Sequence, residues 1–175
     1  MDEALRECVR KLAGRTEPAP LVPRKAWDAE LGAAIERLLP DSDPLKSALH
    51  LWNDNLVRAH EIAQEIGTST GSYLHGVMHR REPDYGNSKY WFHKVGRHPN
   101  FAALRAFALE LLSTRFAELA EIREAVGKSG DWDPFRMVDW CESAEGKDDP
   151  FALFLRTIQA REIGLLASQE RAAIS

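Results

Sequence analysis

The stretch GSYLHGVMHRREPDYGNSKYWFHKVGRHPNF, residues 71–101, decides the fold and contains four of the six histidines of the chain. A helix over residues 71–81 would place His75, His79 and Glu82 at positions i, i+4 and i+7. At about 100° per residue these three side chains lie on one helix face. The spacing therefore predicts a helix that brings two imidazoles and a carboxylate together.

The same stretch contains the boundaries of this helix and the start of another. Ser69 or Thr70 can cap its N-terminus, and Pro83 disfavours helix at the residue before it. A turn-forming segment, EPDYGN, follows. The residues 87–95 then show an amphipathic pattern, with Ser88, Trp91, Phe92 and Val95 on the apolar face. We predict a helical hairpin with a polar, histidine-bearing elbow.

Outside this hairpin most of the chain has helical patterns, apart from a Pro-rich connector that follows the first helix. Asp-Pro pairs at residues 43–44, 133–134 and 149–150 mark three helix starts, because Asp caps and Pro fits the first turn. The residues 101–127 form one long helical pattern in which Ser113 and Thr114 can introduce a bend or break. No segment alternates with a two-residue period. We predict an all-α, antiparallel bundle of about seven to eight helices, in which the four tryptophans outside the hairpin are mostly core: Trp27, Trp52, Trp132 and Trp140.

The 175 residues favour a single domain. We divide it into an N-terminal helix with a Pro-rich connector, residues 1–25, and a helical core, residues 26–175. The positions of Ser88, Phe92 and Pro99 loosely resemble the second helix of a tetratricopeptide unit, but no repeat recurs three times.

A more specific resemblance rests on SYLHGVMHRREPDYGNSKYWFHKVGRHP, residues 72–99. It is supported by LWNDNLVRAHEIAQ from residue 51 and WDPFRMVDWCE from residue 132. These segments resemble an uncharacterised family of bacterial all-α proteins. The resemblance implies a helical unit over about the last three-quarters of the chain and assigns no residue a catalytic role.

The composition of the chain argues against several classes of protein. A net charge of −4 argues against a nucleic-acid binder, which needs a basic face to displace counterions. No apolar run is long enough for a membrane span. Two distant cysteines give neither a disulfide framework nor a metal motif. The N-terminal MDEALRECVRKL lacks the apolar segment of a secretory signal, so we expect a cytoplasmic protein. Its oligomeric state stays open.

The first hypothesis for the central hairpin is a metal site. His75, His79 and Glu82 would be ligands of an open site for Zn, Mn, Fe or Ni. The preceding helix offers Asp54, His60 or Glu61 as a fourth ligand. The motif HGVMH is not the zincin HExxH, because a glycine replaces the general-base glutamate. The alternative is that these histidines satisfy hydrogen bonds inside the hairpin.

Two further hypotheses concern ligands without a metal. Basic residues of the hairpin could bind a small anion, since Lys and Arg exceed the acids by five to two between His75 and His98. Aromatic and polar residues could contact a protein or a small ligand in a helical groove. The alternatives are a solvated basic face and an aromatic core. The candidate ligand-binding residues are Tyr73, Arg80, Arg81, Asp84, Tyr85, Asn87, Lys89, Tyr90, His93 and His98.

The sequence leaves two functions open. The first is a helical binding or interaction module with its polar site at residues 71–99, which takes a small anionic ligand or a protein partner. The second is a metal-dependent enzyme, a hydrolase, that uses His75, His79 and Glu82.

Overall fold

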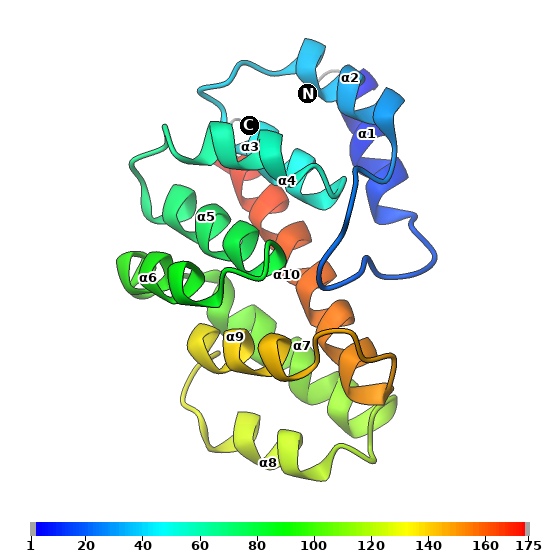
Figure 1. The fold of residues 1–175 in the computed structure, drawn as a ribbon, viewed down its shortest axis with the longest axis vertical. Helices are drawn as coiled ribbons and strands as arrows, with labels where there is room; N and C mark the ends of the chain where they lie inside the picture. Colours follow the sequence, from blue (N-terminus) through cyan, green and yellow to red (C-terminus); the bar gives the residue numbers. More distant parts are fainter. Residues whose placement is uncertain (1–2, 174–175) are drawn as a thin grey trace.

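Ten helices and no strand make up residues 3–173, the part of the chain that the computed structural model describes, with side chains described to residue 168 (Figure 1). The all-α prediction is therefore confirmed. The helices are α1 (Glu3–Ala13), α2 (Ala29–Leu38), α3 (Pro44–Trp52), α4 (Leu56–Ala63), α5 (Ser69–Arg81), α6 (Tyr85–Val95), α7 (Asn100–Thr114), α8 (Ala120–Lys128), α9 (Pro134–Ser143) and α10 (Pro150–Ala173).

The long helix α10 organises the packing. It runs through the middle of the molecule, with α7 and α9 against its first half and α3 against its second half (Figure 1). Its apolar stripe includes Phe154, Leu155, Ile158 and Leu166, which are all fully buried. The buried apolar residues form one cluster that extends from α1 to α10. No helix in the described part of the chain has the length and apolar character that a bilayer-spanning segment needs.

Helix ends follow the capping residues that the sequence shows. The carboxylates of Asp43 and Asp133 accept backbone N–H bonds at the starts of α3 and α9, and Asp149 does so at the start of α10. The predicted helix α5 is capped by Thr68, one residue earlier than expected, and ends at Arg81 before Pro83. Side-chain acceptors thus satisfy N–H groups that have no partner inside their helix.

Two expectations need correction. The described residues form ten helices rather than seven to eight. The pattern over residues 101–127 contributes two of them, because it is interrupted after Thr114. There the hydroxyls of Ser113 and Thr114 bond to the carbonyls of Leu109 and Glu110, and a turn separates α7 from α8. The similarity of the hairpin to a tetratricopeptide unit is not confirmed.

Trp27 is 40% exposed rather than part of the core. It precedes Asp28, which caps α2, so it lies outside the apolar stripe of that helix. Its ring lies instead against the guanidinium of Arg15, 4.9 Å from the ring centroid, while its backbone N–H donates to the carbonyl of Asn53.

The helices α5 and α6 form the closest helix pair and confirm the predicted hairpin (Figure 1). Small residues allow the close approach. The Ser88 hydroxyl donates to the Gly76 carbonyl at 2.7 Å. A Cβ atom at Gly76 would lie 3.1 Å from the Phe92 ring. Since Phe92 is buried, this contact fixes how the hairpin packs.

Candidate metal centre

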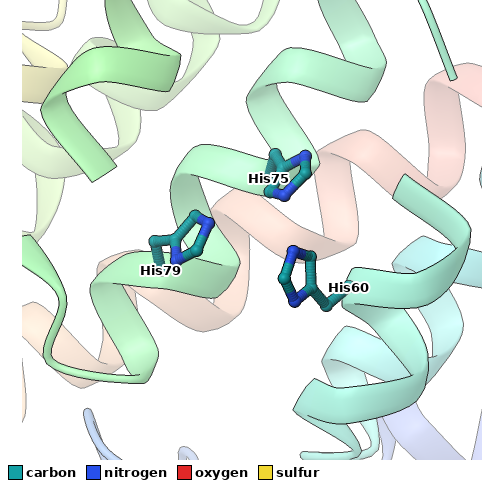
Figure 2. A group of neighbouring side chains, drawn as sticks. All are labelled: His60, His75 and His79. Carbon is teal, nitrogen blue, oxygen red and sulfur yellow. The ribbon is translucent and has the colours of Figure 1, made fainter. Parts of the chain in front are cut away.

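Three histidines from two helices converge beside the hairpin. His75 and His79 lie one turn apart on α5, and His60 reaches them from α4 (Figure 2). One ring nitrogen from each residue lies within 4.8 Å of the other two. The centroids of the His60 and His75 rings are 4.7 Å apart. The structure thus brings three imidazole donors to one point.

The site is buried on one side and reachable on the other. His75 is 3% exposed and His79 is 6% exposed, whereas His60 is half-buried. The indole of Trp91 stacks on the His75 ring at 3.9 Å and covers one ring face. Lys94 lies 4.5 Å above the Trp91 ring. Two of the three rings are therefore shielded from solvent, and the third is partly exposed.

The electrostatic environment keeps two of these rings neutral at pH 7. Burial is the main reason why the pKa of His75 falls to about 4, and His60, His79 and Lys94 add to the effect. Burial and His60 also lower the pKa of His79, against the raising effect of Asp84. Neutral imidazole is the form that binds metals.

His75 also has an unused polar atom. Its Nδ1 is buried and finds no hydrogen-bond partner among the residues that the structure describes. An unpaired buried nitrogen is costly, and in native proteins such an atom usually has a partner that explains it. A bound cation would supply that partner.

Polar groups surround His79. The Nδ2 of Asn87 lies 3.1 Å from its Nε2. The nearest carboxylate oxygens of Glu82 and Asp84 lie 3.7 Å and 3.8 Å from its Nδ1. These carboxylates are beyond direct hydrogen-bond distance and suit an outer shell that orients the ring.

The sequence-based metal set is therefore only partly brought together. His75 and His79 lie together as predicted by their helical spacing. The third candidate ligand is His60, whereas the spacing predicts Glu82. Among the proposed fourth ligands, Asp54 is paired with Arg81 and Arg15, and Glu61 binds Arg58 at 3.0 Å. His60 lies fifteen residues before His75, and only tertiary packing places it there.

The candidate ligand-binding residues do not gather at one place. Arg80 and Arg81 are fully buried in ion pairs, with Glu162 and Asp54 respectively. Asp84 and Asn87 lie beside His79. The remaining candidates lie elsewhere: Tyr73 donates to Glu162, Tyr85 donates to Glu145, Lys89 pairs with Asp139, His93 lies against Phe135, His98 packs on Tyr73, and Tyr90 is exposed beside Lys94.

Of the two acids that pair with these arginines, sequence inspection predicts Asp54 only as a metal ligand and misses Glu162. Glu162 continues the apolar stripe of α10 four residues after Ile158, and it is 1% exposed. Arg80 and Arg81 likewise continue the stripes that begin at Tyr73 and Leu74 on α5. A charge on an apolar stripe predicts a buried partner, and this pattern is visible in the sequence.

Fold and site together define a class, an all-α protein with a histidine cluster between adjacent helices. A comparison with family models, with curated proteins and with solved structures finds no match to this chain.

Proposed function

We propose that this protein binds one divalent transition-metal ion through His60, His75 and His79. The observation that carries the proposal is the convergence of these three imidazoles from α4 and α5 within 4.8 Å. A tetrahedral ion with bonds of about 2.0–2.1 Å would hold its nitrogen ligands roughly 3.3 Å apart. The rings would need to approach by about 1.5 Å at most, which rotation of side chains can supply.

The donor set points to particular ions. Imidazole suits Zn, Fe and Ni, whereas Mn prefers oxygen ligands. We therefore expect Zn, Fe or Ni in preference to Mn.

Three neutral ligands leave the charge of a divalent ion uncompensated and a coordination position open to water. Such an ion supplies an activated water at neutral pH and polarises a carbonyl or phosphoryl group. The carboxylates of Glu82 and Asp84, near His79, can accept a proton from that water or orient the ring. We therefore favour a metal-dependent hydrolytic enzyme over a metal-free binding module.

The ligand set is tested with matched variants of untagged protein purified without chelator. Elemental mass spectrometry measures bound metal, and calorimetry measures Zn affinity in the native chain and in His60→Ala, His75→Ala and Glu82→Ala. His93→Ala is the control, because His93 is exposed and lies away from the cluster against Phe135.

We expect about one ion per chain and a loss of affinity of more than 100-fold in His60→Ala and His75→Ala. Glu82→Ala should weaken Zn binding by about 10-fold to 100-fold, which is the usual effect of removing an outer-shell residue. Absence of metal, with no thermal shift on adding Zn, Fe, Ni or Mn, would refute the site. Equal affinity in His60→Ala and the native chain would refute this ligand set. His60 is half-buried, so its variant keeps the test valid if His75→Ala does not fold.

A further inference from the structure

A cavity of about 530 Å³ lies away from the histidines, between α1, the Pro-rich connector and α10. Leu12, Trp52, Phe107 and Ile163 contribute apolar walls, and Arg81 lines it too. The connector is held against α10, since Arg156 donates to the carbonyls of residues 18 and 19. The volume, and a mainly apolar lining that also includes charged and polar residues, are typical of a small-molecule site.

The charges beside this cavity do not balance. Arg81 and Arg15 both bind the carboxylate of Asp54, one to each oxygen. Asp54 is 4% exposed and adopts a left-handed backbone conformation, φ 61°, between α3 and α4. Among the side chains that the structure describes, two guanidinium groups therefore share one carboxylate, and one positive charge has no counter-ion. The Nε atom of Arg81 is buried and lacks a hydrogen-bond partner within the described side chains.

The ion pair of Arg80 with Glu162, next to Arg81, is an example of a buried positive charge that one carboxylate compensates. Burial alone would lower the pKa of Arg80, but Glu162 outweighs it and leaves that pKa raised. Burial also lowers the pKa of Arg81, and there Asp54 does not restore it, partly because Arg15 and Arg80 add like charge. Two further lining residues, Glu17 and Arg161, are exposed and have opposite charges, so together they add no net charge. The net charge facing the cavity is thus one positive charge, next to Arg81.

We propose that this cavity binds a small monocarboxylate with an apolar body, whose carboxylate accepts hydrogen bonds from Arg81 and Arg15. One negative charge would neutralise the excess that Asp54 leaves, and a guanidinium fork matches a carboxylate in geometry. The apolar body would lie against Trp52, Phe107 and Ile163. A dianionic phosphate would exceed the available charge, and a neutral alcohol would leave it uncompensated.

Octanoate is used as the test ligand, and 1-octanol serves as an uncharged control of the same size. Binding to the full chain is followed by calorimetry and by the fluorescence change of the tryptophans, one of which, Trp52, lines the cavity. Arg15→Gln leaves one guanidinium for the Asp54 carboxylate. Ala160→Phe reduces the cavity volume from the α10 side without replacing an arginine. Arg105→Gln, on α7 with bonds only to carbonyls near the end of α8, is the control.

We expect saturable binding of one octanoate per chain, at least 10-fold tighter than 1-octanol. Arg15→Gln should abolish this preference for the acid, Ala160→Phe should abolish binding of both probes, and Arg105→Gln should change neither. Absence of saturable octanoate binding, equal affinity for the alcohol, or unchanged binding in Ala160→Phe would overturn the proposal. His60→Ala separates this proposal from the metal site, because it should leave octanoate binding intact.

Discussion

Replacement of Glu162 by Gln should destabilise the protein more than any conservative change on its surface. The Glu162 carboxylate accepts hydrogen bonds from the Tyr73 hydroxyl at 2.8 Å and from the guanidinium of Arg80. The side chains of Arg80 and Glu162 are 0% and 1% exposed. Glutamine keeps the shape and one acceptor but removes the charge, so the Arg80 cation would remain buried without a counter-ion.

The expected magnitude follows from that burial. Removing one partner of a buried ion pair costs about 3–5 kcal/mol, because the remaining charge is desolvated and unpaired. For a chain of this length, each kcal/mol lowers Tm by about 2–4 °C. The predicted decrease is therefore roughly 6–20 °C. Glu124→Gln is the matched control, since it breaks an exposed pair with Lys128 on α8 and should cost about 0.5 kcal/mol or less.

Urea and thermal unfolding, followed by circular dichroism, measure both variants. A double variant, Arg80→Met with Glu162→Gln, removes both charges and should be more stable than Glu162→Gln alone. A cost below about 1 kcal/mol for Glu162→Gln, or no recovery in the double variant, would refute the reasoning that an uncompensated buried charge dominates the loss.

Two further predictions concern packing and acid. Gly76→Ala should destabilise by about 1 kcal/mol, because overpacking against Phe92 exceeds the gain in helix propensity. The control is Gly127→Ala in α8, where no atom lies within 4 Å of the new Cβ, and it should stabilise the protein by about 0.5–1 kcal/mol. Urea unfolding measures both variants. Equal effects of the two substitutions on stability would contradict the importance of the Phe92 contact. The metal-free protein should lose stability as pH falls from about 6.5 to about 4, because the folded-state pKa of His75 is lowered to about 4 and the unfolded chain takes up the proton first. His75 alone should contribute a loss of up to about 3 kcal/mol, and His79, whose pKa is also lowered, should add to it. Urea midpoints at pH 7 and pH 5 in chelator measure this loss, and a midpoint that rises at pH 5 would contradict the sign.

Local signals were enough to predict much of the fold. Asp-Pro pairs predicted helix starts correctly, since capping and the first-turn tolerance of proline depend only on adjacent residues. The hairpin of residues 71–95 was predicted from period and turn residues alone. The number of helices is higher than predicted, and the break after Thr114 explains one of the additional helices. That break depends on side-chain bonds to the preceding turn, which sequence leaves undecided. The exposure of Trp27 depends on where the cap of α2 falls.

The candidate site was less predictable, because its parts come from different helices. The pair His75 and His79 was visible from helical spacing, but His60 joins them only through the packing of α4 on α5. The positive charges of Arg80 and Arg81 predict ligand-binding or surface roles, although each residue continues an apolar stripe. Burial of their charges depends on Glu162 and Asp54, at distances of 82 and 27 residues along the chain.

The buried charges also explain how the histidine cluster is held in place. At about 100° per residue, Arg81 lies roughly 200° around α5 from His79, on the opposite face. Arg80 ties this helix to α10, and Arg81 ties it to Asp54, directly before the residue that caps α4. The rotation of α5 and its register against α4 are thereby fixed by directional contacts rather than by apolar packing alone. Because His60 belongs to α4, this fixed register is what sets its distance to the two histidines of α5.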